Sequence, residues 1–345
     1  MAKQLEHDPR LEHARHWLAE MGCPIHEIRP ASADASFRRY WRIALAAPWQ
    51  FGDIELGDGD TMILMDAPPE HENTAQFVKI ANACAQAELL APRVLALRET
   101  DGFAILDDLG DTTVLPVLQQ TPALAETLYA QAGALLHRWQ ARIDPIALEL
   151  PAYDAAFLQT EMDLFRDWLC AQHMDAAFST ADKVEWQRLS EVLIRNAQQQ
   201  PQVAVHRDFH SRNLMLHNDT LAMIDFQDAM HGPITYDLIS LLRDAYIEWP
   251  LAQVCEWAMH WFDDCESLQD VSPEQQLRWL LLMGVQRQLK VGGIFARLSI
   301  RDGKHQYLAD IPRTLSYIVA LRGRFPELDW IIDLIERRCL PVLSS

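Results

Sequence analysis

Hydrophobic and polar residues alternate in short runs in the first third of the chain and follow a helical period in the rest. The short apolar runs predict strands near 37–46 and at 61–67, 93–97 and 103–107. A first helix is expected to open at Pro9 behind an Asp8 cap, and a second to span about 73–90 behind an Asn73 cap. The simplest assembly is a small antiparallel sheet with a helix packed against it.

After residue 108 the apolar residues recur at helical spacing. The predicted helices span 121–141, 154–172, 180–199, 235–245, 251–265, 273–298, 310–323 and 326–338. They are interrupted at 203–225, where three strand-like runs occupy 203–205, 214–216 and 221–224. The pattern indicates an α+β chain with a small mixed lobe over 1–108 and a large, mainly helical lobe over 109–345.

The polar residues of this interruption indicate a chemistry. His206-Arg207-Asp208 is followed by four residues and Asn213, and Ile224-Asp225-Phe226 comes twelve residues later. Phosphoryl transfer needs a carboxylate that orients an acceptor hydroxyl and takes its proton, and hard oxygen ligands for Mg²⁺. Asp208 fits the first role, and Asn213 and Asp225 fit the second, because the order matches the kinase pattern HRDxxxxN followed by an aspartate motif.

A polar hairpin whose aspartate and asparagine cap turns would explain any one of these residues alone. The ordered set between apolar strands favours the functional interpretation. His206 is expected to be a buried orienting histidine rather than a group that transfers protons. Asp237 is expected either to cap the helix at 235–245 or to support the loop that carries Asp208.

Further motifs add a resemblance to a known family. They are Ser32-Ala33-Asp34-Ala35-Ser36-Phe37-Arg38-Arg39-Tyr40, Met65-Asp66-Ala67-Pro68-Pro69 and Gly232-Pro233-Ile234-Thr235-Tyr236-Asp237-Leu238. With the HRD loop, they resemble the aminoglycoside phosphotransferase and choline kinase family, which has a two-lobe protein-kinase-like fold. The resemblance is closest to the bacterial branch that phosphorylates the anomeric hydroxyl of N-acetylmuramate and N-acetylglucosamine in peptidoglycan recycling. It covers about 30–250.

The resemblance implies ATP and Mg²⁺ as cofactors and gives roles to residues. Asp208 is the catalytic residue, and Asn213 and Asp225 are the metal ligands. The residues implied to bind nucleotide, over the phosphates or at the hinge between lobes, are Ser32, Ser36, Arg38, Asp107 and Leu109. Candidates for substrate binding are His210, Arg212 and Asp228, with Arg212 the arginine closest in sequence to the HRD motif for the lactyl carboxylate of N-acetylmuramate.

Two features depart from the kinase pattern. The segment 31–38 contains no glycine, although phosphate-covering loops are usually glycine-rich. The third strand, 61–66, lacks the lysine that pairs with phosphates, and Lys79 lies within a predicted helix. Arg38 and Arg42 lie on one face of the neighbouring strand, so either could replace that lysine. The glutamate partner cannot be assigned from the sequence.

Weaker candidates for the acceptor pocket come from the helical lobe. Three arginines, Arg243, Arg297 and Arg301, and three tryptophans, Trp249, Trp261 and Trp279, could contribute to it. For each tryptophan the helical spacing favours core packing over contact with a sugar face.

Composition limits the partners. Of 345 residues, 49% are hydrophobic and 23% are charged, as in globular proteins. Thirty basic and 49 acidic residues give a net charge of −19, which argues against binding nucleic acid or anionic lipid. There is no apolar run of about 18 residues, and the charged start MAKQLEHDPRLEH is unlike a signal peptide. The six cysteines lack CxxC spacing, and we expect a cytoplasmic protein with free thiols.

The function that fits best is an ATP- and Mg²⁺-dependent kinase that converts a small amino-sugar substrate to its 1-phosphate. One alternative is a kinase for another acceptor, such as an aminoglycoside, choline or homoserine. A second is a pseudokinase that binds nucleotide without catalysis. The missing lysine favours the pseudokinase, whereas the joint presence of Asp208, Asn213 and Asp225 argues against it.

Overall fold

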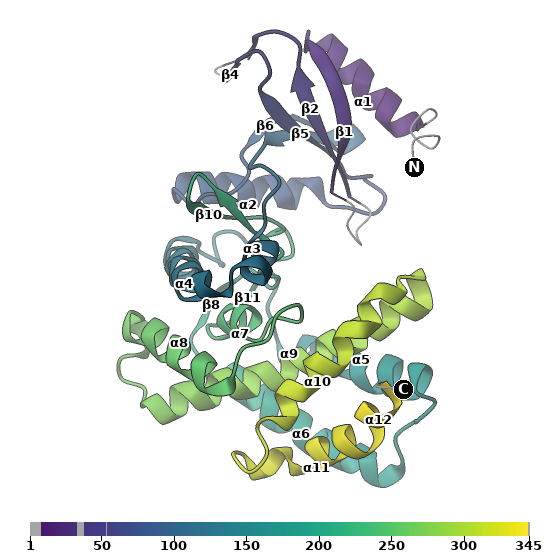
Figure 1. The fold of residues 1–345 in the computed structure, drawn as a ribbon, viewed down its shortest axis with the longest axis vertical. Helices are drawn as coiled ribbons and strands as arrows, with labels where there is room; N and C mark the ends of the chain where they lie inside the picture. Colours follow the sequence, from purple (N-terminus) through teal and green to yellow (C-terminus); the bar gives the residue numbers. More distant parts are fainter. Residues whose placement is uncertain (1–7, 33–37, 53, 344–345) are drawn as a thin grey trace. The chain divides into compact units, whose positions relative to one another are not determined.

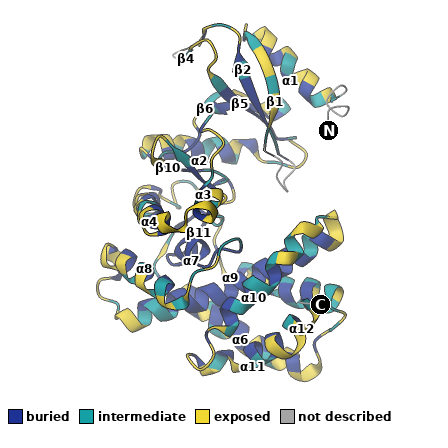
Figure 2. Cartoon of the chain, in the orientation of Figure 1, coloured by how far each residue is buried: buried dark blue, intermediate teal, exposed yellow. Residues whose placement is uncertain are grey.

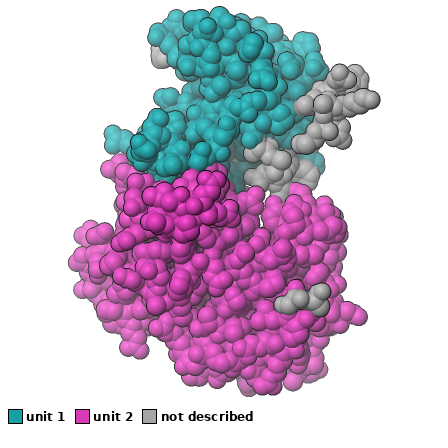
Figure 3. Space-filling model, viewed as in Figure 1, with its two compact units in different colours: residues 1–112, 215–227 teal, residues 113–214, 228–345 magenta. Residues whose placement is uncertain are grey.

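The computed structural model describes residues 8–32, 38–52 and 54–343. The chain forms two compact units (Figure 3). The sheet unit comprises residues 1–112 and 215–227, and the helical unit comprises 113–214 and 228–345. In the described residues, no helix combines the length and the apolar character that are needed to cross a bilayer.

A five-stranded antiparallel sheet forms the centre of the sheet unit (Figure 1). In spatial order its strands are β1 (Ile25–Ser32), β2 (Arg39–Leu45), β5 (Thr61–Asp66), β7 (Phe103–Asp107) and β6 (Val94–Arg98). A separate two-stranded ribbon joins β3 (Trp49–Phe51) to β4 (Ile54–Leu56), and a 3₁₀ turn spans Glu99–Asp101. The predicted antiparallel sheet is confirmed.

The sequence pattern did not predict β1. Its apolar residues Ile25 and Ile28 do not alternate, Pro30 lies within the strand, and the pairing with β2 shifts register between Ile25 and Glu27 and again between Pro30 and Ser32. Such irregularities remove the period of two that identifies a strand.

Both predicted helices of the sheet unit are present. α1 (Pro9–Glu20) begins behind Asp8, and α2 (Thr74–Gln86) begins behind Asn73, whose Oδ1 accepts from the Gln76 N–H at 3.0 Å. The apolar face of α1 packs on one face of the sheet, as the dark blue residues of Figure 2 show. The residues buried in this layer include Leu11, Trp17, Leu18, Trp41, Ile43, Met62, Leu64, Phe103 and Ile105.

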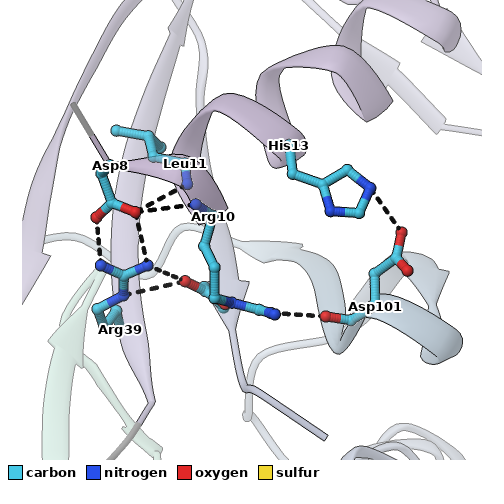
Figure 4. Close-up of polar contacts among 7 residues, drawn as sticks. Asp8, Arg10, Leu11, His13, Arg39 and Asp101 are labelled. Carbon is cyan, nitrogen blue, oxygen red and sulfur yellow. Dashed lines mark hydrogen bonds and ion pairs between the residues drawn. The ribbon is translucent and has the colours of Figure 1, made fainter. Parts of the chain in front are cut away.

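One carboxylate joins α1 to the sheet (Figure 4). Asp66, at the end of β5, accepts from Arg10 Nε at 2.7 Å and from Arg39 Nε at 3.0 Å. Arg39 also bonds to Asp8, whose Oδ1 caps α1 through the Arg10 N–H at 3.1 Å. Arg10 continues to the carbonyl of Asp101 at 2.6 Å. The Met65-Asp66 motif therefore has a structural role, which is to fix α1 against the sheet.

A hairpin completes the sheet unit. β9 (Leu214–His217) and β10 (Thr220–Met223) are joined by Asn218 and Asp219, which have positive φ angles of 47° and 61°. Asparagine and aspartate tolerate this conformation better than other non-glycine residues, which explains the tight turn. The Met223 N–H donates to the Leu90 carbonyl at 3.0 Å, so the hairpin belongs with the sheet unit.

Helices dominate the other unit, as predicted. They are α3 (Val114–Gln120), α4 (Ala125–Arg142), α5 (Ala155–Leu164), a π-helical continuation (Phe165–His173), α6 (Thr180–Gln198), α7 (Tyr236–Leu242), α8 (Leu251–Asp263), α9 (Pro273–Asp302), α10 (Ile311–Val319), α11 (Asp329–Leu334), a second π-helical segment (Ile335–Cys339) and α12 (Leu340–Leu343). Short 3₁₀ turns span Pro122–Leu124, Glu266–Leu268, His305–Asp310 and Pro326–Leu328. Of these helices, α3 and α12 were not predicted.

The long helix α9 runs through the middle of this unit (Figure 1). At Gly293 a Cβ atom would lie 2.3 Å from the carbonyl carbon of Leu164, so only glycine allows α9 to pass this close to the end of α5. A small ribbon pairs β8 (Gln202–Val205) with β11 (Met230–Pro233). β11 was not predicted, because its Gly232-Pro233 pair is typical of turns.

We expect Asp66→Asn to lower the free energy of unfolding by about 2 kcal/mol, because a buried carboxylate between two arginines is lost. Urea denaturation followed by circular dichroism measures this change. Asp101→Asn is the matched control, since Arg10 bonds to the backbone of Asp101 and not to its side chain. Equal midpoints for wild type and Asp66→Asn would contradict the role of this carboxylate.

Candidate active site

The HRD loop (residues 206–213) begins where β8 ends, and one carboxylate fixes its backbone. Asp237, at the start of α7, is fully buried and accepts the N–H of His206 at 2.7 Å and that of Arg207 at 2.9 Å. Arg207 has a φ of 80°, a strained conformation for a residue with a side chain. The expectation that Asp237 supports this loop is confirmed. Burial raises the pKa of Asp237 to about 7, against the lowering effect of these two hydrogen bonds.

A buried ion cluster holds the side chain of Arg207. Glu161 of α5 accepts from Arg207 Nη2 at 2.7 Å and lies 2.9 Å from Lys290 Nζ of α9. Tyr153 also donates to Glu161, and Lys290 donates to the Tyr236 hydroxyl at 2.8 Å. Burial alone would raise the pKa of Glu161, but the two cations outweigh it and hold the pKa below its ordinary value. Glu161 and Lys290 were not predicted from the sequence.

The same positive charges act on Asp208. Burial would raise the pKa of Asp208, but the charges of Lys290 and Arg207 help to lower it below the ordinary value. The carboxylate is therefore ionised at neutral pH and can accept a hydrogen bond from a hydroxyl group. That is the state that a residue orienting an acceptor hydroxyl needs.

The far end of the loop is fixed by side chains as well. Asp244, which follows α7, accepts the N–H of Ser211 at 3.0 Å and also the Ser211 hydroxyl. Asn213 Nδ2 donates to the carbonyl of Asp208 at 3.0 Å, and the Asn213 N–H donates to the carbonyl of His210 at 2.9 Å. These bonds fix the plane of the Asn213 amide relative to Asp208.

Asp225 belongs to the sheet unit, whereas Asp208 and Asn213 belong to the helical unit. Asp225 follows β10 and has a φ of 68°, in the left-handed region. Its Oδ1 accepts from Gln227 Nε2 at 2.7 Å. The next residue, Phe226, is fully buried and stacks on Phe77 of α2 with ring centroids 5.1 Å apart. This packing anchors the segment that carries the Asp225 carboxylate.

The residues expected at the phosphates are described in part. Arg38 is 8% exposed and forms an ion pair of 2.6 Å with Glu72, which lies just before α2. Ser32 ends β1, and Ser36 lies outside the described residues. Glu72 is therefore the partner of Arg38, and nothing in the sequence distinguishes it from other acidic residues before a helix.

The residues expected at the hinge are held by local contacts. Asp107 accepts from Arg93 Nε at 2.6 Å. Leu109 is buried against Met215 and Ala222 of the hairpin. Arg42, one of the two candidates to replace the lysine, donates to the side chain of Asp108 at 2.8 Å and to the carbonyl of Gly110 at 2.9 Å. This leaves Arg38 as the better candidate.

Of the three residues expected to bind substrate, two lie against the ring of Tyr246 and the third is exposed elsewhere. His210 meets Tyr246 edge-on, with centroids 5.7 Å apart, and the guanidinium of Arg212 lies 4.6 Å from the centre of the same ring. Asp228 is exposed and lies beyond the hairpin. Trp261 and Trp279 are buried in the core, as their spacing favoured, and Trp249 donates to the Tyr129 hydroxyl at 2.7 Å.

We expect Glu161→Gln to lower the free energy of unfolding by about 3 kcal/mol and to lower kcat, because Arg207 and Lys290 lose their shared anion. Thermal denaturation and steady-state kinetics measure the two effects. Glu185→Gln is the matched control, since Glu185 pairs with the exposed Arg188, and its effect should stay within about 0.5 kcal/mol.

The loss of stability in Glu161→Gln should become smaller as the pH falls. Because the pKa of Glu161 is lowered in the folded state, its stabilising contribution is complete above the ordinary pKa of about 4.3. The contribution is lost as the pH falls through the lower folded-state value, so wild type and variant should converge in acid. A constant difference at all pH values would contradict an ionised Glu161.

Comparisons with known sequences show the family of this chain. The model of the phosphotransferase enzyme family matches residues 27–270. An N-acetylmuramate/N-acetylglucosamine kinase of Pseudomonas putida is 40% identical over 344 residues, which cover 96% of this chain and 97% of the relative. A relative with the same name from Pseudomonas aeruginosa is 42% identical over 90% of this chain and 88% of its own length.

Solved structures show the same fold. A choline/ethanolamine kinase family protein of Mesorhizobium loti aligns with a TM-score of 0.62 at 15% identity, over 97% of this chain and 99% of that one. The gentamicin complex of an aminoglycoside phosphotransferase aligns with a TM-score of 0.59 at 13% identity, over 94% and 98%. The predicted two-lobe, protein-kinase-like α+β fold is thus confirmed, and the chain belongs to the phosphotransferase enzyme family.

Proposed function

We propose that this phosphotransferase uses ATP and Mg²⁺ to phosphorylate the anomeric hydroxyl of N-acetylmuramate or N-acetylglucosamine. The observation that carries the proposal is the HRD loop, whose backbone is fixed by Asp237 and in which Asn213 donates to the carbonyl of Asp208. The acceptor is supported by the relatives named N-acetylmuramate/N-acetylglucosamine kinase, at 40–42% identity over at least 90% of this chain. The product would be a sugar 1-phosphate.

In the proposed reaction, the acceptor hydroxyl lies against Asp208. Its oxygen forms a bond to the γ-phosphorus of ATP, the bond from that phosphorus to the ADP oxygen breaks, and the proton passes to the Asp208 carboxylate. Arg207 and Lys290 support this step, because their charges keep Asp208 ionised before the proton arrives. Asp237 supports it by fixing the backbone on which Asp208 is carried.

Asn213 and Asp225 are the proposed magnesium ligands, and bound magnesium would neutralise charge on the β- and γ-phosphates. In the described residues no group of three or more His, Cys, Asp or Glu side chains could hold a metal ion. A single carboxylate and an amide suit an ion that keeps phosphate oxygens and water among its ligands. The donor set therefore fits magnesium that is bound together with a nucleotide.

For the nucleotide, we propose that Arg38 takes the role of the missing lysine, with Glu72 as its partner. Ser32 and Ser36 would contact the phosphates, and Asp107 and Leu109 would contact the base. In this proposal the lobe of residues 1–108 covers the nucleotide, and the lobe of residues 109–345 binds the acceptor.

We expect Asp208→Asn to lower kcat by about 10²-fold or more, because the acceptor for the hydroxyl proton is lost while the fold and nucleotide binding remain. ADP release with N-acetylglucosamine measures turnover, and titration calorimetry measures nucleotide binding. Asp219→Asn, in the β9–β10 turn, is a control with the same chemical change away from the loop. Turnover of Asp208→Asn at the wild-type rate would exclude Asp208 as the catalytic residue.

The position of the phosphate in the product shows which hydroxyl of the sugar is the acceptor. Phosphorus NMR of the product from either sugar should show coupling of the phosphorus to the anomeric proton. A 6-phosphate would refute the anomeric hydroxyl as acceptor. Turnover of kanamycin, choline or homoserine but of neither sugar would favour a kinase for another acceptor, and nucleotide binding without turnover of any acceptor would favour a pseudokinase.

A further inference from the structure

A buried arginine near the HRD loop forms no ion pair with any described residue. Arg287 of α9 is only 4% exposed, and its Nη1 is fully buried without a hydrogen-bond partner. Within the described part of the chain, its guanidinium forms no hydrogen bond or ion pair. By contrast, the buried cations Lys290 and Arg207 share the carboxylate of Glu161.

An isolated buried charge is costly to maintain. A lysine in this position could lose its proton, but arginine stays charged in proteins. Burying a charge without a partner costs several kcal/mol, so such groups are usually paired or bind a ligand. The charge of Arg287 lowers the pKa of the buried Asp237, but its Nη1 has no hydrogen-bond partner among the described residues, so the guanidinium is suited to bind a further anion.

Arg287 lies on the part of α9 that packs against α7. One turn earlier, Gly284 lets α9 approach α7 closely, since a Cβ there would lie 2.9 Å from Ile239 Cγ1. α7 carries Asp237, which fixes the backbone of the loop. Lys290, three residues after Arg287 and on the same face of α9, reaches Glu161 at 2.9 Å.

A second polar group close to Arg287 is also unsatisfied. The Nδ1 atom of His210 is buried and has no hydrogen-bond partner among the described residues. Burial lowers the pKa of His210; the carboxylates of Asp244 and Asp208 raise it, and the charges of Arg287 and Arg212 lower it, and the net shift is downward, toward the neutral imidazole. A neutral imidazole that carries its proton on Nδ1 can donate to an anion, as can the guanidinium of Arg287.

We propose that Arg287 binds the carboxylate of an acidic acceptor, which for N-acetylmuramate is its lactyl carboxylate, and thereby sets the preference for this sugar over N-acetylglucosamine. The inference rests on the proposed function, since it assumes an amino-sugar acceptor at the HRD loop. Arg212, the arginine favoured by sequence proximity, is exposed and lies over Tyr246. A buried guanidinium interacts more strongly with a carboxylate than an exposed one, because water screens it less.

The test compares kcat/KM for N-acetylmuramate, its methyl ester and N-acetylglucosamine in wild type, Arg287→Gln and Arg287→Lys. The ester removes the negative charge from the substrate without changing the protein. Arg287→Gln should lower kcat/KM for N-acetylmuramate about 10²-fold more than for N-acetylglucosamine, and should abolish the preference for acid over ester. Arg287→Lys should restore part of that preference. Arg188→Gln, an exposed arginine of α6 that pairs with Glu185, is the control and should leave all ratios unchanged.

Equal losses for the two sugars in Arg287→Gln would overturn the inference and make Arg287 a structural counter-charge to the buried aspartates. If that variant does not fold, the wild type still decides, because equal kcat/KM for acid and ester would also overturn it. Failure of the proposed function is distinguishable, since the wild type would then phosphorylate neither sugar.

Discussion

The carboxylate of Glu161 is shared by two cations that come from distant parts of the helical unit. Arg207 enters from the HRD loop and Lys290 from α9, and Tyr153 adds a hydrogen bond. The Glu161 carboxylate stabilises both cations. Without it, two unpaired positive groups would lie inside the protein, which is energetically costly. The position of the loop therefore depends on an interaction outside the reacting atoms.

The electrostatic consequence reaches Asp208. The cluster has a net positive charge, which lowers the pKa of Asp208 despite its burial. Asp237 adds a constraint on the backbone conformation. Its two hydrogen bonds hold Arg207 in a left-handed conformation that a residue with a side chain usually avoids. Asp237 and the Glu161 cluster thus both position the proposed catalytic carboxylate, the cluster also affects its charge, and all of these residues lie in the helical unit.

Sequence reasoning succeeded where the information is local. The Asp8 cap and the HRDxxxxN spacing act over a few residues, so the pattern predicted them. It missed the partners that lie far apart in the chain: Arg207 and Glu161 are separated by 46 positions, and no local signal marks either Glu161 or Lys290 as buried and charged. The strand that contains Pro30 was missed for a different reason, because its register shifts break the alternation.

The central claim is that the buried cations hold Asp208 ionised before substrate binds. Carbon-13 NMR of labelled aspartate carboxyl groups, with the Asp208 signal assigned by its loss in Asp208→Asn, tests this claim most directly. The account predicts that the signal stays at its ionised position from neutral pH to below the ordinary aspartate pKa of about 3.9, or until the protein unfolds in acid. A titration midpoint for Asp208 at about pH 5 or above in the folded protein would contradict it.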